Sequence, residues 1–222
     1  MSNGKLIVIE GLDGSGKATQ TALLKNALIQ AGYPVKHISF PDYNSPSSAL
    51  VKMYLGGQLG SNPSDVNAYA ASSFYAVDRY ASYKQFWQQD YEKGDVILAD
   101  RYATSNAIYQ LSKIDDDKKD EFLQWLEFYE YAQLQLPKPD VVIYLDMPIE
   151  ISQKLMTKRY NGDESKKDLH ESNFNFLKEC RNSALYSAKQ QGWHIVKCAK
   201  DEMPRSIEDI HTEVMSVVKK YL

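Results

Sequence analysis

Short apolar runs alternate along this chain with longer segments whose apolar residues recur every three to four positions. The runs are too short for helices and are bounded by turn or charged residues, which predicts buried strands. They lie at 5–10, 35–40, 95–99, 141–146 and 194–198. The fourth run, Val-Val-Ile-Tyr-Leu, is apolar without alternation, as in a strand covered on both faces.

The segments between the runs carry helical periodicity. They lie at about 16–31, 65–92, 103–112, 118–134, 148–159, 171–191 and 204–220. Strands that alternate with helices indicate a parallel sheet with crossover connections, and ligands then bind beyond the carboxyl ends of the strands. No repeat or linker interrupts the pattern, so we expect one α/β domain over residues 1–222, a three-layer fold with a five-stranded parallel sheet flanked by helices.

Segment 65–92 has the clearest amphipathic pattern, and we expect most of its apolar stripe to be core. The stripe consists of Val66, Tyr69, Ala70, Phe74, Val77, Tyr80, Ala81 and Trp87. Tyr75 and Arg79 lie beside it, four residues apart and therefore on one face. An aromatic ring with a guanidinium suits a flat base, although Asp78 and Arg79 would also fit a surface ion pair.

Segment 118–134 carries Phe122, Trp125, Leu126 and Tyr129 at helical spacing. This pattern indicates core or a subunit contact.

Composition and charge argue against several classes of protein. The net charge of −3 and pI of about 5.8 create no general attraction for nucleic acid. No 18-residue apolar run exists and strand-like sequence starts at about Lys5, so we expect neither a membrane span nor a signal peptide. Cys180 and Cys198 form neither a disulfide framework nor a metal spacing, which favours the cytoplasm. The scattered histidines, His37, His170, His194 and His211, predict no metal site.

A glycine-rich stretch, Ile-Val-Ile-Glu-Gly-Leu-Asp-Gly-Ser-Gly-Lys-Ala-Thr-Gln at 7–20, joins the first strand to the first helix. It fits a phosphate-binding loop, in which backbone N–H groups, a helix N-terminus and Lys17 hold phosphates. The expected ATP-binding residues are Gly11, Leu12, Asp13, Gly14, Ser15, Gly16, Lys17, Ala18 and Thr19. Ala18 occupies the position where Ser or Thr normally reaches Mg²⁺, and Thr19 points about 100° further round the helix. The alternative is an ordinary glycine turn between a strand and a helix.

Two further loops follow predicted strands. In Phe40-Pro41-Asp42-Tyr43 the proline restricts the backbone and holds Phe40 and Tyr43 in place, although this stretch taken alone favours a plain loop with two packed aromatics.

The second loop opens with Asp100-Arg101. The acid stands where Mg²⁺ is usually held, and the arginine can fork onto phosphate oxygens. Asn106 and Tyr109 are three residues apart and face one pocket, where an amide can match a pyrimidine imide edge. A helix N-terminus with a capping acid is the alternative reading.

Residues 154–167 hold five basic side chains against two acidic ones around an Asn-Gly-Asp turn signal. We expect a mobile lid at about 154–170 that closes over a triphosphate. A solvated charged loop is the alternative.

Together these motifs resemble the thymidylate kinase (dTMP kinase) family of P-loop nucleoside monophosphate kinases, and the likeness covers essentially the whole chain. It is carried by the motifs at 11–17, 40–41, 75–79, 100–106, 136–140 and 145–146. The Asp-Arg-Tyr…Ser-Asn run is the family-specific part, since the phosphate loop alone indicates only a P-loop kinase.

The resemblance implies transfer of the γ-phosphoryl group of ATP, with Mg²⁺ as cofactor, to dTMP. The products are dTDP and ADP, and the reaction belongs to dTTP synthesis. The resemblance also implies a homodimer, for which the helices around 65–92 and 118–134 offer aromatic surface. The partners expected are ATP, dTMP and a second copy of the chain.

The resemblance also assigns roles to the phosphate-side residues. Lys17 holds ATP phosphates, Arg101 bridges the donor and acceptor phosphates, and Asp13 meets the sugar 3′-hydroxyl or a Mg²⁺-bound water. Asp100 holds Mg²⁺ through water. Arg159 is the expected lid cation, with Lys158 as second choice.

On the acceptor side, Phe40 and Tyr43 line the site. Tyr75 stacks on thymine, while Arg79 and Asn106 read its edge. Tyr109 presses against C2′ of the sugar and disfavours ribose.

Two departures from the family pattern affect these roles. Asp42 stands where relatives often have Arg, which removes one expected acceptor-phosphate contact. Ala18 removes one Mg²⁺ ligand, a gap that water held by Asp100 and Asp13 can fill.

Two rival functions remain open from the sequence. A deoxynucleoside kinase would act on a neutral hydroxyl and need a general base. A nucleotide-binding switch of the GTPase type would carry an Asn-Lys-x-Asp motif, which this sequence lacks.

Overall fold

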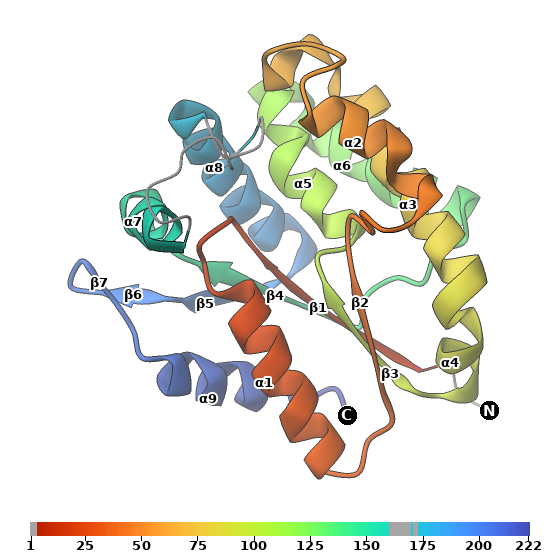
Figure 1. The fold of residues 1–222 in the computed structure, drawn as a ribbon, viewed down its shortest axis with the longest axis vertical. Coiled ribbons are helices and arrows are strands. Elements are labelled where there is room, and N and C mark those ends of the chain that lie inside the picture. Colours follow the sequence, from red (N-terminus) through yellow and green to blue (C-terminus); the bar gives the residue numbers. More distant parts are fainter. Residues whose placement is uncertain (1–3, 160–169, 171–172) are drawn as a thin grey trace.

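A computed structural model describes residues 4–159, 170 and 173–222. Its centre is a parallel five-stranded sheet in the order β2-β3-β1-β4-β5 (Figure 1). The strands are β1 (Lys5–Gly11), β2 (Val35–Ser39), β3 (Val96–Asp100), β4 (Val141–Asp146) and β5 (His194–Lys197). The predicted fold class and all five predicted strands are confirmed.

Burial differs between the centre and the edges of the sheet. The three central strands, β1, β3 and β4, are almost wholly buried, whereas β2 and β5 are mostly half-buried or exposed, with Ile38 and Val196 as their buried residues. The expectation of full burial was wrong for β2 and β5, because each has a neighbouring strand on one side only.

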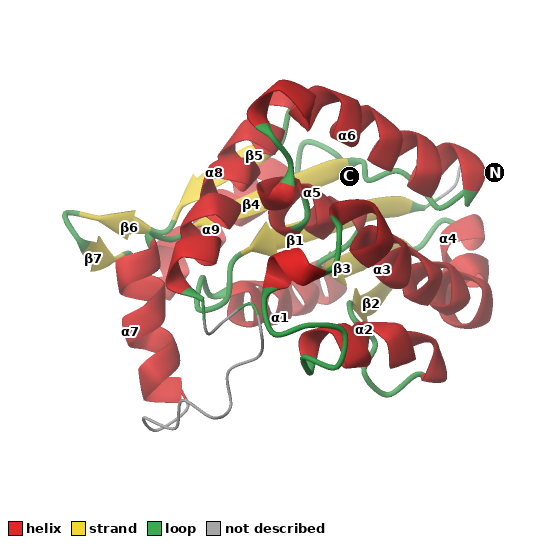
Figure 2. Ribbon diagram, turned by 90° about the horizontal axis from the view of Figure 1, so that it is seen from above, coloured by secondary structure: helices red, strands yellow, loops and turns green. Residues whose placement is uncertain are grey.

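Helices cover both faces of the sheet (Figure 2). On one face α1 (Lys17–Gln30) packs against α9 (Ile207–Val218), and on the other α5 (Asn106–Tyr109) packs against α8 (Phe174–Gln191). Strand β1 feeds both cores by alternation, since Ile7 and Ile9 join one cluster while Leu6 and Val8 join the other.

The remaining elements lie around this core. They are α2 (Ala49–Leu55), α3 (Ala68–Ser82), α4 (Gln88–Lys93), α6 (Lys119–Glu127), α7 (Ile149–Arg159), two π-helical turns (Tyr83–Trp87 and Phe128–Gln133) and the antiparallel pair β6 (Ala199–Lys200) and β7 (Met203–Pro204). The sequence pattern predicted neither α2 nor the β6–β7 pair. The helix expected at 103–112 is a short α5 between 3₁₀ turns.

Helix α3 is rotated relative to the sequence expectation. Of the eight stripe residues, only Trp87 is buried, and Tyr69, Val77 and Tyr80 are each more than one third exposed. The buried face instead carries small and polar side chains: Ala68, Ala71, Ser72, Ala76, Asp78, Arg79 and Ser82. That face packs against the turns at 46–48 and 103–105, so it borders the functional edge of the sheet.

Within the described part of the chain, no helix combines the length and apolarity that a membrane span requires.

Candidate active site

A cavity of about 480 Å³ opens where β1, β2 and β3 end. Most of the predicted site residues line it: Asp13, Lys17, Ala18, Phe40, Tyr43, Tyr75, Arg79, Asp100, Arg101, Asn106 and Tyr109. The fold therefore brings the phosphate loop, the loop after β2, α3 and the loop after β3 to one place, as parallel-sheet topology predicts.

The phosphate loop leads directly into α1. Gly14 and Gly16 have φ values of 79° and 92°, which favour glycine. A Cβ on Gly14 would meet the Ser152 carbonyl oxygen at 2.6 Å, whereas a Cβ on Gly16 would meet nothing within 4 Å. Gly16 is the N-cap of α1, so the open space beside it adjoins a helix N-terminus, an arrangement suited to an anion.

Asp13, Lys17 and Arg101 form a charged cluster in the cavity. The Asp13 Oδ1 atom accepts a hydrogen bond from Arg101 Nη2 at 2.6 Å and lies 3.5 Å from Lys17 Nζ. Burial pushes the pKa of Asp13 upward, but the charges of Arg101 and Lys17 outweigh it and hold the pKa well below its usual range. Asp13 is therefore ionised at neutral pH.

The two cations respond differently to burial. Burial, together with the nearby charge of Arg101, lowers the pKa of Lys17. For Arg101 the pKa rises well above its usual value, because Asp13, Tyr109 and other groups outweigh the burial effect.

Glu10 holds the turn that follows Arg101. Its buried carboxylate accepts hydrogen bonds from the Tyr102 amide at 3.2 Å, Thr104 Oγ1 at 2.7 Å and Ser105 Oγ at 2.9 Å. Burial raises the pKa of Glu10. Sequence reasoning missed this residue, although a lone acid in the apolar run of β1 was a signal for it.

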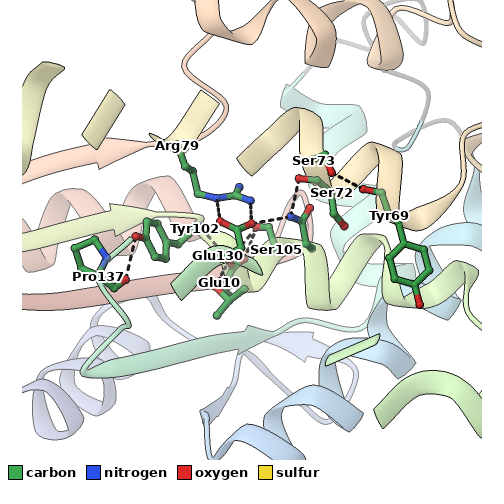
Figure 3. Close-up of polar contacts among 11 residues, drawn as sticks. Glu10, Tyr69, Ser72, Ser73, Arg79, Tyr102, Ser105, Glu130 and Pro137 are labelled. Atoms are coloured by element: carbon green, nitrogen blue, oxygen red, sulfur yellow. Dashed lines mark hydrogen bonds and ion pairs between the residues drawn. The ribbon is translucent and has the colours of Figure 1, made fainter. Parts of the chain in front are cut away.

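The base-recognition residues meet a second buried acid, Glu130. Arg79 faces Glu130 in Figure 3, where Arg79 Nε donates to Oε2 at 3.1 Å and Nη2 donates to Oε1. Asn106 Nδ2 donates to the same Oε1 at 3.2 Å and to the Ser72 carbonyl at 3.3 Å. Sequence reasoning missed Glu130, which lies four residues after Leu126 on the buried face of its helix.

The surface ion pair considered for Asp78 and Arg79 is wrong, since both side chains are 1% exposed. Asp78 instead accepts a hydrogen bond from the backbone amide of Asp42 at 3.0 Å, which ties the loop after β2 to α3. The positions of Phe40 and Tyr43 differ: Phe40 is buried with its ring 6.1 Å from that of Tyr102, whereas Tyr43 is 51% exposed.

His170 also lines the cavity, and nothing in the sequence pattern assigned it there. Its ring stacks on Tyr109 at 5.3 Å, and its Nε2 atom lies 2.8 Å from the Tyr54 hydroxyl. Burial, reinforced by the charge of Lys113, lowers the pKa of His170 to about 3, so the ring is neutral at physiological pH. Tyr109 in turn donates its hydroxyl hydrogen to Asp13 Oδ2 at 3.2 Å.

The carboxylates of the cavity suit a hard cation such as Mg²⁺. Both Asp13 oxygens already accept hydrogen bonds, whereas no described residue donates one to the Asp100 carboxylate. Within the described ranges no group of three or more His, Cys, Asp or Glu residues could hold a metal ion. The donor set fits an ion that keeps water and phosphate ligands and takes Asp100 as its protein contact.

Other predicted residues lie outside this cluster. Gly11, Leu12, Gly14, Ser15, Gly16 and Thr19 belong to the loop and to the start of α1 but do not line the cavity. Arg159 and Lys158 lie at the end of α7, and their side chains are outside the described part of the structure. Of the expected lid, 154–159 belongs to α7, His170 is described, and 160–169 lies outside the described residues.

The glycine loop before α1, the cations beside it and the parallel sheet behind it are consistent with the P-loop kinase fold. The thymidylate kinase family model matches residues 9–214, and this chain belongs to the thymidylate kinase family. It is accordingly a kinase, and its family supports phosphorylation of dTMP.

Individual relatives agree with this placement. A thymidylate kinase from Mycobacterium tuberculosis is 32% identical over 85% of this chain and 87% of its own length. A thymidylate kinase from Schizosaccharomyces pombe is 27% identical over 98% of this chain and 92% of its own length. The solved structure of thymidylate kinase from Candida albicans, 24% identical, has the same fold, with a TM-score of 0.70 over 99% of this chain and 93% of that one.

Proposed function

We propose that this protein transfers the γ-phosphoryl group of ATP to the 5′-phosphate of dTMP, with Mg²⁺ as cofactor, and so supplies dTDP for dTTP synthesis. One observation carries the proposal. Lys17 and Arg101, the cations suited to phosphates, line the same cavity as the base-recognition residues Tyr75, Arg79 and Asn106.

The phosphate side of the cavity accounts for catalysis. The acceptor phosphate is already an anion at neutral pH and needs little help from a base. The barrier lies in bringing two anions together and in stabilising charge on the transferring group. Lys17 and the loop amides bind the ATP phosphates, and Arg101 bridges donor and acceptor.

Asp13 orients this cluster. It holds Arg101 at 2.6 Å and is itself held by the Tyr109 hydroxyl. When the phosphates bind, the Asp13 carboxylate is available to the sugar 3′-hydroxyl or to water around the metal. Asp100 would hold Mg²⁺ through water, and the bound ion would supply charge neutralisation between the phosphates.

The residues expected around the base account for the choice of dTMP as substrate. Tyr75, half-buried in the cavity wall, offers a ring for stacking on thymine, and Arg79 and Asn106 offer a donor and an acceptor for its edge. Tyr109, on which the His170 ring stacks at 5.3 Å, is the residue that would press against C2′ of the sugar and disfavour ribose. Phe40 and Tyr43 complete the acceptor side, and Arg159 provides the lid charge.

An assay of ADP release tests the proposal when ATP and Mg²⁺ are combined separately with dTMP and with thymidine. Turnover with dTMP and none with thymidine is expected. Turnover with thymidine alone would establish the deoxynucleoside kinase instead, and tight GTP binding without transfer would establish the nucleotide switch.

We also propose a cytoplasmic homodimer. Cys180 and Cys198 are free and buried, which is typical of a reducing compartment. Exposed apolar side chains gather on α3 and the turn after α6, where Val77 is 43%, Tyr80 42% and Phe128 57% exposed. Such a patch is typical of a subunit interface.

A further inference from the structure

We propose that Glu130 is a positioning residue that determines base specificity, because its carboxylate fixes which hydrogen-bonding groups Arg79 and Asn106 present to the substrate. The cavity thereby selects a pyrimidine with a carbonyl at C4 and an N–H at N3 over one with an amino group at C4. This inference rests on the proposed function and deepens it.

Both carboxylate oxygens of Glu130 accept hydrogen bonds from the base-recognition residues Arg79 and Asn106. Oε2 accepts from Arg79 Nε at 3.1 Å, while Oε1 accepts from both Arg79 Nη2 and Asn106 Nδ2. Glu130 is 0% and Arg79 1% exposed, so water does not compete for these bonds. A side-on pair between a guanidinium and a carboxylate fixes the plane of both groups.

These bonds set the orientation of the Asn106 amide. Its Nδ2 atom has two hydrogens, and the two acceptors beside it, Glu130 Oε1 and the Ser72 carbonyl, take both of them. A reversed amide would place Oδ1 against two acceptors, which is unfavourable. Oδ1 is left as an acceptor, and no described residue donates to it.

Arg79 presents the opposite polarity. A guanidinium can only donate, and Nη1 makes no hydrogen bond with any described residue. Since both residues line the cavity, the pair offers one donor and one acceptor to the base. A thymine ring matches this pair, because its O4 accepts and its N3–H donates. A cytosine ring opposes it, because its N4 amino group donates and its N3 accepts.

The backbone around Glu130 holds the carboxylate in place. Glu130 lies in the π-helical turn Phe128–Gln133, and its carbonyl accepts from the Leu136 amide at 3.1 Å. π-Helical turns occur often at functional sites. Through Arg79 and Asn106 the carboxylate joins α3 to α5.

The decisive variant is Glu130→Gln, which keeps the shape and removes one acceptor. With its nitrogen at the Oε1 position, the new amide opposes Asn106 and Arg79 Nη2; at the Oε2 position, it opposes Arg79 Nε. In the first orientation the Asn106 amide loses the acceptor that sets its polarity. In the second orientation Arg79 Nε loses its acceptor, so the guanidinium is no longer held in its plane. Values of kcat/KM are measured with dTMP and dCMP, and folding is checked by thermal unfolding and circular dichroism.

The matched control is Glu127→Gln. Glu127 lies three residues earlier on the same helical segment and bonds to Lys138 at the surface. The Glu127→Gln variant loses the same charge at a position that does not contact Arg79 or Asn106. We therefore expect this variant to keep the wild-type preference for dTMP over dCMP.

We expect the ratio of kcat/KM for dTMP to that for dCMP to fall at least about tenfold in folded Glu130→Gln, mainly through a higher KM for dTMP. Loss of a merely structural contact would lower both rates together and leave the ratio unchanged. An unchanged ratio in the folded variant overturns the inference.

Because a broken buried ion pair can prevent folding, Glu130→Asp is the second variant. It keeps the charge but draws the carboxylate back by one methylene group. If only this variant folds, a ratio lowered at least about threefold supports the inference and an unchanged ratio overturns it. Failure of the proposed function is distinguishable, because the wild type would then not phosphorylate dTMP at all.

Discussion

Acidic side chains with partners far away in the sequence organise the chemistry of this protein. Asp13 holds Arg101, Glu10 holds the turn after Arg101, and Glu130 holds Arg79. In each case an acid fixes a cation or a backbone segment that faces the cavity. Losing one member of such a pair therefore affects the geometry of the site as well as its charge.

Arg101→Ala tests the phosphate side. Removal of a cation that stabilises the transferring group typically lowers turnover by about 10³, so we expect kcat to fall by that order. Steady-state kinetics with dTMP measure it, and circular dichroism confirms that the fold is intact. The control Lys118→Ala, on an exposed pair with Asp115, retains full turnover. Near-normal kcat in Arg101→Ala would exclude its assigned role.

His170 gives the protein an acid-sensitive stability. Its pKa is about 3 when folded and ordinarily 6.5, so between these values the unfolded chain binds the extra proton. Stability that is present above about pH 6.5 is lost as the pH falls towards 3.

The test compares the wild type with His170→Phe, which keeps a ring against Tyr109. We expect the unfolding free energy of the wild type to fall more steeply between pH 6 and pH 4, by up to about 1.4 kcal/mol per pH unit. Urea unfolding at a series of pH values measures both slopes, and parallel curves would contradict the assignment.

At the scale of elements, the sequence predicts the strands, the phosphate loop and the Asp100-Arg101 motif, because each is encoded by a short local pattern. The orientation of α3 was not predicted, because its buried face is built from alanine, serine and charged residues that helical hydrophobicity does not detect. Glu10, Glu130 and His170 were missed for a related reason. Hydrogen bonds join them to residues 24 to 116 positions away in the chain, and no local sequence pattern indicates such bonds.

The glycines of the phosphate loop give a prediction at this scale. Gly16→Ala introduces only backbone strain, about 1–2 kcal/mol, because its Cβ meets open space. Gly14→Ala adds a collision with the Ser152 carbonyl and Met156, typically another 1–3 kcal/mol or so. Urea unfolding of both variants measures the difference, and equal losses would contradict this description of the loop.

At the scale of the whole molecule, the strand order places β1 between β3 and β4, so the phosphate loop and Asp100-Arg101 end side by side. Helix α3 crosses the same edge with its polar face inward and an apolar face outward. Tyr69 on α3 contacts Trp125 of α6 at 4.7 Å between ring centres, which joins the two helices into one outer surface.

That surface predicts the assembly. The wild type is expected to sediment as a dimer, and Tyr80→Glu as a monomer, because a charge replaces a side chain 42% exposed in the apolar patch. Ile29→Glu on α1, at a position 49% exposed outside this surface, serves as the control and remains dimeric. Sedimentation velocity distinguishes the two, and a monomeric wild type would contradict the proposed homodimer.

In the proposed reaction two nucleotides meet over the carboxyl edge of the sheet, with their phosphates between Lys17 and Arg101. The most direct measurement is product analysis after incubation with ATP, Mg²⁺ and dTMP, with dUMP and thymidine in parallel. We predict equal amounts of ADP and dTDP from ATP and dTMP, and no thymidine monophosphate from thymidine. No dTDP from dTMP, with the protein folded and Mg²⁺ present, would contradict the account.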